Sequence, residues 1–364
     1  MIEVGKLVAA AESEAARWDR EGLPAEMIAL AGESGLLGAD RSVAFGGRGL
    51  DALELGRLAA TVGQVCTSLR SLLTVHGMVA AAVDRWGTGE QRNAWLPRLT
   101  SGETVAALAA TEAGAGTELA GVATTFEVDG ADRLVSGTKL WVTFGQVAGV
   151  FLVLGRSDGG LCAALVERDR PGVRVEPVES GIGLHGARLA TVRFDRVRIP
   201  VAQLIAPPGF GLSHVVGTAL DHGRFTVAWG CAGLARACLE DAAAHAATRT
   251  QGGAALAGHQ LIRAALGRGW VDVEGAQAMC ERAAASRIAG SPQALIDTIA
   301  AKYAAAAAAA TVSERAVQVL GAAGCAPDSR VGRFYRDAKV MQIIEGAQEV
   351  AEVTMGEHVL RGVR

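Results

Sequence analysis

The sequence predicts an α+β protein with a helical N-terminal domain, a small central β domain and a C-terminal four-helix bundle. Apolar positions follow a helical period in the first hundred residues and again in the last third of the chain, whereas short β-branched runs fill the middle. Asp-Gly, Gly-Gly and Pro-Gly turn signals concentrate in that middle segment. We therefore expect domains at residues 1–102, 103–206 and 207–364.

Start signals place the helices of the N-terminal domain. Pro24 begins the helical segment 24–37, at a position where proline is favoured. Asp51 can cap a helix that ends near Val65, and a further helix is expected over 89–99. In the central domain the β-branched runs predict six strands, at residues 125–129, 134–143, 150–155, 162–167, 173–178 and 191–199.

The C-terminal domain should contain four helices. The alanine run 304–310 predicts a tightly packed third helix, and the fourth should run from about Val331 to Leu360. The first two have apolar stripes at Val227, Cys231, Leu234 and Cys238, and at Ile262, Leu266, Trp270 and Val273. No strand followed by GxGxxG, no P-loop and no HExxH motif occurs, which argues against nicotinamide-Rossmann, NTPase and zincin functions.

Composition excludes several classes of function. The chain has 364 residues, 50% of them hydrophobic and 20% charged, and a net charge of -3, which suits a folded protein and not a nucleic-acid binder. Prolines and glycines interrupt the long charge-free run 199–220, so no membrane span is expected. Acidic residues near the N-terminus argue against a signal peptide, and we expect a cytoplasmic protein.

The six cysteines are spread along the chain without a CxxC pair or a histidine at metal-ligand spacing. We interpret them as reduced thiols in the core and predict no metal site. Cys231 and Cys238 share one helix face, where they would fill the core.

Three segments carry residue types suited to chemistry. In TEAGAGTELAG, at 111–121, the small residues Gly114 and Gly116 let backbone N–H groups approach a pyrophosphate, and the threonines add donors. Taken alone, an ordinary glycine-rich turn explains this segment better. In GTKLWVTFG, Trp141 and Thr143 should project from one face of a strand and suit a flat flavin ring, although Trp141 could equally belong to the core.

The third segment is RDAKVMQIIEGAQEV, near the C-terminus. Glu345 follows Ile343 and Ile344, and apolar neighbours would raise the pKa of its carboxyl toward about 6 to 7, which suits a general base. Most glutamates are solvated surface charges, so this position alone does not establish catalysis.

Together the three segments resemble the acyl-CoA dehydrogenase family over essentially the whole chain. TEAGAGTE is similar to the family's TEPGAGSD, GTKLWVT to GxKxWIT, and RDAKVMQIIEGAQEV to RDAKxxxIYEGTxEI. HGRFTVAWGCAGLARA and AVQVLGAAG fit further helical signatures of the family. The resemblance implies an FAD enzyme with the three domains described above.

The resemblance also assigns roles to residues. Glu345 would be the catalytic base, supported by Arg224, and a backbone N–H beside it, at Gly346, would polarise the thioester carbonyl. The preceding helix position that carries the base in some members is Gly223 here, which cannot act. The positions implied for FAD are Ala110, Thr111, Gly116, Thr117, Trp141, Thr143, Arg249, Gln318, Ala322 and Glu349. Because Arg249 and Gln318 match residues that reach the cofactor of a neighbouring chain, a homodimer or homotetramer is implied.

The motifs depart from the family at several positions. Gly252 stands where the family has an aromatic residue that covers the adenine, so a weaker hold on FAD is expected. The other departures are Ala113 for proline, Thr117 for serine, Glu118 for aspartate, Ile344 for tyrosine and Ala347 for threonine.

SLRSLLTVHGM and VAWGCAGLARAC also resemble a narrower branch of the family, which oxidises a small acyl group, such as glyceryl, on an acyl carrier protein in polyketide extender-unit (methoxymalonyl type) biosynthesis. The alternatives are an ordinary short-chain acyl-CoA dehydrogenase, a flavin oxidase or monooxygenase, and a scaffold without cofactor. Electrons would pass to a flavoprotein or to oxygen. His76, His214 and His222 are candidates for contact with a hydroxylated substrate, although each could be structural.

Overall fold

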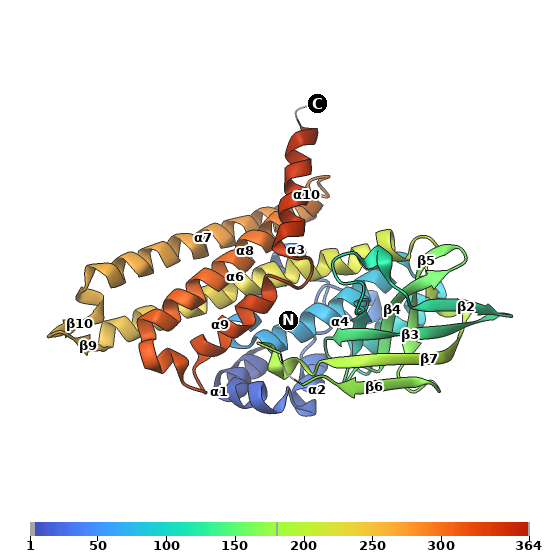
Figure 1. Ribbon diagram of the computed structural model, residues 1–364, viewed down its shortest axis with the longest axis horizontal. Helices are drawn as coiled ribbons and strands as arrows, with labels where there is room; N and C mark the ends of the chain where they lie inside the picture. The colour runs from blue at the N-terminus through green and yellow to red at the C-terminus, as the bar shows by residue number, and fades with distance from the viewer. Residues whose placement is uncertain (1–3, 180, 363–364) are drawn as a thin grey trace.

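The computed structural model describes residues 4–179 and 181–362. The helices of the first hundred residues pack against the helices of the C-terminal bundle, and the sheet lies at one end of the bundle (Figure 1). This arrangement of N-terminal helices, central sheet and C-terminal helical bundle confirms the predicted fold class. The exact domain limits stay predictions, and residues 1–3 and 363–364 of the outer two domains lie outside the described ranges.

The N-terminal helices begin where their capping residues predict. The helix after Asp51 starts with a capping box in which Asp51 and Glu54 bond each other's backbone N–H. Thr88 and Gln91 form a second capping box. The helices are α1 (Gly5–Glu21), α2 (Ala25–Glu33), α3 (Ala52–Val65), α4 (Thr67–Trp86) and α5 (Gly89–Thr100). Nearly every residue of α4 is buried, which makes this helix the centre of the molecule.

The sheet contains the six predicted strands and two that the sequence did not indicate. Its strands are β1 (Ala106–Ala109), β2 (Thr125–Asp129), β3 (Asp132–Val142), β4 (Val150–Ser157), β5 (Gly160–Glu167), β6 (Val173–Pro177), β7 (Ala190–Pro200) and β8 (Leu204–Ile205). The order is β6-β7-β3-β2-β4-β5-β8, and β1 pairs in parallel with β4. The missed strand β1 reads AALA, which has no β-branched residue and forms a strand only because it is buried beside β4.

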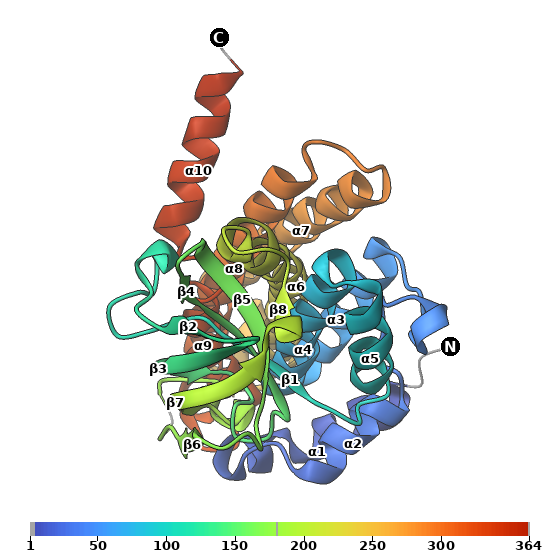
Figure 2. The ribbon, with the colours of Figure 1, turned by 90° about the vertical axis from the view of Figure 1, so that its right-hand side faces the viewer.

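The C-terminal bundle consists of α6 (Gly217–Thr248), α7 (Gln260–Ile288), α8 (Ala294–Leu320), α9 (Arg330–Met341) and α10 (Gln348–Arg361). A π-helical turn (Gly211–Val216) leads into α6, and the hairpin of β9 (Thr250–Gln251) and β10 (Ala254–Ala255) joins α6 to α7. Figure 2 shows α10 projecting away from the rest of the molecule.

The prediction of one helix from about Val331 to Leu360 is wrong. The chain leaves the helix after Met341 and resumes it only at Gln348. Between these points Glu345 and Gly346 have φ angles of +56° and +99°, which a right-handed helix cannot contain. The break separates α9 from α10.

Two further expectations about burial are wrong. Trp270 does not belong to a buried stripe: its side chain is 58% exposed, because α7 packs on α8 and α3 through other positions such as Val273. Five cysteines are buried free thiols as expected, but Cys325 is exposed in the 3-10 turn (Gly321–Cys325) after α8.

The alanine run packs α8 tightly against its neighbours, as predicted. Ala305, Ala306 and Ala309 are completely buried, and α8 makes its most extensive contacts with α6. The segment Ala294–Cys325 is long and apolar enough to cross a membrane by length and composition, yet 56% of its apolar window is buried inside the protein. A buried bundle helix satisfies the same test.

Close backbone contact joins the N-terminal helices to the bundle. A Cβ atom added to Gly63 of α3 would lie 2.5 Å from the carbonyl oxygen of Gly230 on α6. Side chains would therefore hold the two helices apart, and glycine lets them approach.

We predict that Gly63→Ala destabilises the protein by about 1–3 kcal/mol, because backbone atoms must move to admit the methyl group. The measurement is the free energy of unfolding from a denaturant titration. The matched control is Gly275→Ala on α7, where a Cβ atom meets no atom within 4 Å, and a gain of up to about 1 kcal/mol is expected from helix propensity. Equal effects of the two variants would contradict this account.

Candidate active site

Two cations, the half-buried Arg224 and the buried Lys302, hold the turn between α9 and α10. Nε of Arg224, on α6, donates to the carbonyl oxygen of Glu345 at 2.8 Å. Nζ of Lys302, on α8, donates to the next carbonyl oxygen, that of Gly346, at 2.7 Å. These bonds satisfy carbonyls freed by the helix break and fix the left-handed backbone of Glu345. The turn is therefore held from two helices of the bundle.

The carboxyl group of Glu345 points into the protein toward α6 and α4. A Cβ atom added to Gly223 would lie 2.8 Å from Oε2 of Glu345 and 2.9 Å from the sulfur of Met78. Oε2 is buried and has no hydrogen-bond partner among the described residues. The absence of a side chain at Gly223 thus creates the space that the carboxyl group occupies.

Burial raises the pKa of Glu345 to about 7, against the opposing effects of the positive charges on Arg224, Lys302 and Arg70. The direction agrees with the expectation from the sequence, but the source of desolvation differs. Ile343 is 57% exposed, so it does not shield the carboxyl group. The packing against Gly223 and Met78 does so instead.

The loop after β1 is anchored by a buried ion pair that was not singled out from the sequence. Nζ of Lys139 lies 2.7 Å from Oε1 of Glu112 and donates to the carbonyl oxygen of Ala110 at 3.0 Å. Glu112 also accepts bonds from the backbone N–H groups of Ala123 and Thr124. Although burial raises the pKa of Glu112, its bonds to Lys139 and Thr124 lower it to about 2, so the carboxylate is charged at neutral pH.

This anchor brings Ala110 and Thr111 beside Trp141. The N–H of Leu140 donates to the carbonyl oxygen of Thr111 at 2.9 Å. Trp141 has a φ of +57° at an irregularity in the β3–β7 pairing, and its indole is 56% exposed. Regular strand alternation therefore does not govern Trp141 and Thr143, which is half-buried just beyond β3.

The described residues here fit the pattern expected for a flavin site. A large exposed indole lies beside backbone groups that can bond a heterocycle edge. Added Cβ atoms at Gly114 and Gly116 would meet nothing within 4 Å, so the glycine loop leaves open space at its surface, and Thr117 is exposed beside it. An isoalloxazine ring and a pyrophosphate can be accommodated at these groups.

The other predicted cofactor residues lie elsewhere. Arg249 follows α6 directly and so lies beside β9, at the end of the bundle opposite the sheet (Figure 1). Gln318 near the end of α8 and Ala322 in the turn after it are exposed, as is Glu349 in the first turn of α10. A single chain therefore does not bring Arg249 together with Trp141.

The hairpin geometry explains the departure at Gly252. Gly252 and Gly253 form the two-residue connection between β9 and β10, with φ angles of +61° and +81°. Such a turn favours glycine at both positions. Glycine therefore replaces the family's aromatic residue at a position whose positive φ favours glycine.

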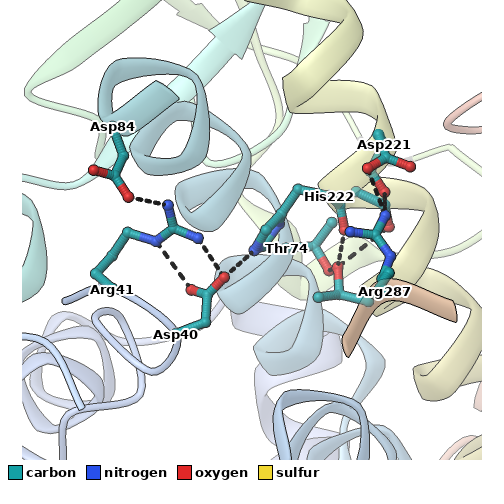
Figure 3. A network of polar contacts seen from close by, with 9 residues as sticks. Asp40, Arg41, Thr74, Asp84, Asp221, His222 and Arg287 are labelled. Atoms are coloured by element: carbon teal, nitrogen blue, oxygen red, sulfur yellow. Dashed lines mark hydrogen bonds and ion pairs between the residues drawn. The ribbon is translucent and has the colours of Figure 1, made fainter. Parts of the chain in front are cut away.

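A cleft lined by both polar and apolar side chains lies between the N-terminal helices and the bundle. Its volume is about 1180 Å³, and its lining includes Arg224, which also holds the Glu345 turn. Figure 3 shows the polar network along this cleft, in which His222 and Arg41 both contact Asp40. Although burial opposes it, the charges of Arg41 and His222 hold the pKa of Asp40 below its usual range. Among the residues that line this cleft, the sequence indicated a functional role only for Arg224, His214 and His222.

The three histidine candidates differ in their surroundings. His76 is fully buried, contacts the backbone of Leu99 and Ala106, and has its pKa lowered to about 4 by burial, so it is structural. His214 and His222 both line the cleft. In the part of the chain that the structure describes, no group of three or more His, Cys, Asp or Glu side chains could hold a metal ion.

Lys302 and Glu112 were missed for different reasons. Glu112 belongs to the TEAGAG segment, but its role depends on the partner Lys139, which is distant in sequence from it. Lys302 lies in α8 just before the alanine run, and between Asp297 and Glu314 no other residue is charged. A lone cation in such an apolar stretch is the signal that could have identified it.

Family models match nearly the whole chain. The acyl-CoA dehydrogenase N-terminal domain matches residues 4–103, the middle domain 107–197 and the C-terminal domain 210–360. The human mitochondrial short-chain specific acyl-CoA dehydrogenase is 31% identical over 357 residues, which cover 96% of this chain and 86% of that protein.

Solved structures are similar over the full length. FkbI, described as acting in biosynthesis of the methoxymalonyl extender unit of the FK520 polyketide, has 38% identity and a TM-score of 0.92, with 98% of this chain and 99% of that chain covered. Butyryl-CoA dehydrogenase from Megasphaera elsdenii has 26% identity and a TM-score of 0.92, with 99% of both chains covered.

Proposed function

Because the chain belongs to the acyl-CoA dehydrogenase family of FAD-dependent oxidoreductases that act on acyl thioesters, we propose that Glu345 is its catalytic base and that its substrate is a small acyl group on an acyl carrier protein. The observation that carries the proposal is the buried carboxyl of Glu345, which Arg224 positions and whose pKa burial raises to about 7. A carboxyl group with this pKa can accept a proton near neutral pH.

The reaction begins at the α-carbon of the acyl thioester. The backbone N–H of Gly346 has no hydrogen-bond partner among the described residues and is free to bond the thioester carbonyl oxygen, which acidifies the α-carbon. Glu345 then accepts the α-proton on Oε2, the buried oxygen that faces Gly223. Arg224 and Lys302 hold the backbone of Glu345 while the charge of its carboxyl group changes.

The residues around Trp141 would hold the flavin. Ala110 and Thr111 would bond the edge of the ring, Trp141 would pack on it and Thr143 would donate near it, while Gly116 and Thr117 would meet the pyrophosphate. Bound FAD would supply the acceptor for the hydride that leaves the β-carbon. Lys139 and Glu112 keep the ring-binding loop in place.

We propose that a second copy of the chain completes the cofactor site. Arg249, Gln318 and Ala322 lie on the end of the bundle opposite the sheet, so they would reach the FAD of a partner in a homodimer or homotetramer, and Glu349 would contact the cofactor from α10. An electron-transferring flavoprotein or oxygen would reoxidise the enzyme, which we propose to be cytoplasmic.

The similarity to FkbI supports a carrier protein as the source of the acyl group, in polyketide extender-unit biosynthesis of the methoxymalonyl type. The cleft beside Arg224 could admit the pantetheine arm that carries such a group. The second candidate is an ordinary short-chain acyl-CoA dehydrogenase, which the 31% identity to the human short-chain enzyme favours.

We predict that Glu345→Gln keeps FAD bound and lowers the rate of flavin reduction by substrate at least a thousandfold, because the amide cannot accept the α-proton. Anaerobic stopped-flow absorbance of the flavin measures the rate. Glu357→Gln is the control, since Glu357 is an exposed residue of α10 paired with Arg361. Retained reduction by Glu345→Gln would place the base elsewhere.

The choice of carrier is tested by presenting the same glyceryl group on an acyl carrier protein and on CoA, with butyryl-CoA as the short-chain comparison. We expect the carrier-protein thioester to reduce the flavin with the highest kcat/KM. Equal or better reduction by butyryl-CoA would reject the carrier assignment and leave the short-chain acyl-CoA dehydrogenase.

The pH dependence follows from the raised pKa of Glu345. Because the base must be ionised, kcat/KM for flavin reduction should rise with pH and level off above about 7. The raised pKa affects stability in the opposite direction to activity. Between about pH 4.5 and 7 the folded protein retains a proton on Glu345 that the unfolded chain loses. The contribution of this proton to the free energy of unfolding is therefore lost as the pH rises through about 7. A rate that is independent of pH from 5 to 9 would contradict the assignment.

A further inference from the structure

Arg224 and the backbone N–H of Gly346 are joined through one peptide group. Nε of Arg224 donates to the carbonyl oxygen of Glu345 at 2.8 Å, and this carbonyl belongs to the same peptide group as the N–H of Gly346. The peptide is trans, so its C=O and N–H bonds point in opposite directions. The guanidinium therefore lies at one end of the peptide group, and an N–H without a hydrogen-bond partner among the described residues lies at the other.

The positive charge of Arg224 is not used in an ion pair within α6. Asp221, one turn earlier on this helix, pairs with Arg287 at 2.6 Å. Among the described residues, the hydrogen bond of the guanidinium goes to the neutral carbonyl of Glu345. A guanidinium ion stays charged in proteins, and a hydrogen bond from a charged donor is stronger than one from a neutral donor. The charge therefore acts mainly on this one peptide group.

Lys302 holds the same turn but acts on a different peptide group. Its Nζ donates to the carbonyl oxygen of Gly346 at 2.7 Å, and that carbonyl shares its peptide group with the N–H of Ala347. Both cations thus fix the backbone of the turn. Only Arg224 bonds the peptide group whose N–H belongs to Gly346.

Hydrogen bonds that follow one another in a chain strengthen each other, because each one polarises the next. When the guanidinium draws electron density toward the carbonyl oxygen of Glu345, the N–H of Gly346 becomes more positive and donates more strongly. The effect is larger where little water is present to screen the charge. Negative charge that develops on an acceptor at Gly346 is then stabilised by the cation through the peptide group.

We propose that Arg224 is a positioning residue that also strengthens the hydrogen bond from Gly346 to the thioester carbonyl, by polarising the peptide group between them. The inference rests on the proposed function, because it takes Glu345 and Gly346 to meet the α-carbon and the carbonyl oxygen of an acyl thioester. Loss of the charge of Arg224 therefore weakens this donor even where the turn keeps its shape. Loss of Lys302 does not.

The stretching frequency of a bound thioester carbonyl reports the strength of this hydrogen bond. The probe is an acetyl thioester with an isotopic carbon label at its carbonyl, offered on CoA and on an acyl carrier protein; it has no β-carbon, so no hydride can leave. Isotope-edited infrared spectroscopy on the FAD-loaded wild-type protein should show the band at a lower frequency than in the free probe. Equal FAD occupancy in all variants keeps the contribution of the cofactor constant. A wild-type band at the frequency of the free probe would overturn the proposal.

Arg224→Gln separates the charge from the position. The side-chain amide nitrogen of glutamine lies as many bonds from Cα as Nε of arginine, so it can donate to the same carbonyl without a charge. We expect Arg224→Gln to lose about half of the wild-type lowering of the band, because a charge-assisted hydrogen bond is about twice as strong as a neutral one. Arg224→Met removes both the bond and the charge and should lose more. Full lowering in Arg224→Gln would show that position alone matters and would overturn the proposal.

Two control variants distinguish this effect from a general disturbance of the turn or of α6. Lys302→Met removes the other cation of the turn and should keep most of the lowering. Arg236→Met removes a cation from the surface of α6, where Arg236 pairs with Glu274, and should keep all of it. If Arg224→Met does not fold, Arg224→Gln decides the question. Equal losses in Arg224→Gln and Lys302→Met would contradict the assignment to Arg224.

Failure of the proposed function gives a different result. If no acyl thioester reduced the flavin of the wild-type protein, the catalytic assignment would fail even with the carbonyl band lowered. If thioesters reduced the flavin and Arg224→Gln kept the full lowering, only the role of Arg224 would fail. Glu345→Gln should keep the lowered band while it loses flavin reduction, because the peptide group between positions 345 and 346 is unchanged.

Discussion

The bonds from Arg224 and Lys302 to two consecutive carbonyls are the interaction on which the candidate site depends. They stabilise a turn that interrupts the last helical segment, and the turn directs a carboxyl group inward that an unbroken helix would carry outward or along its own face. Both donors are cations, so the same pair that fixes the backbone also stabilises the carboxylate once it forms. One pair of residues thus fixes the position of Glu345 and lowers the pKa of its carboxyl group, against the larger effect of burial.

Close helix packing supplies the second condition. Glycines at 63, 223 and 230 remove side chains where α3, α4 and α6 meet, and at Gly223 the space is taken by the carboxyl group of Glu345. Gly223 admits the carboxyl of Glu345, and Gly230 admits Arg70. The helices therefore approach closely enough to exclude water and yet keep charged groups between them, which desolvates those groups and alters their proton affinities.

The sequence predicted the order of the domains and the six longer strands, and it singled out the segment that carries Glu345, because each depends on a local period or on a motif of adjacent residues. It did not predict the break before α10, since the RDAKVMQIIEGAQEV segment has helical neighbours on both sides and the clamp comes from distant residues. Strand β1 has the composition of a helix and is fixed by pairing with β4. Three pairs are formed by contacts between segments far apart in the chain, which no spacing in one segment reveals: Lys139 with Glu112, Asp40 with His222, and Thr74 with Thr226.

Because the carboxyl group of Glu345 packs against Gly223, only one of these two positions can carry an acidic side chain. A methyl group at 223 already occupies the volume of the present carboxyl, so an ancestor or descendant with the acid on α6 could not keep a glutamate in the turn. A glycine at position 345 would also remove backbone strain, because glycine adopts a positive φ without the steric cost that glutamate has there. Moving the proton acceptor from the turn to α6 thus requires substitutions at both positions. If position 223 gains its acidic residue first, the two side chains clash; if position 345 loses its glutamate first, the protein has no base.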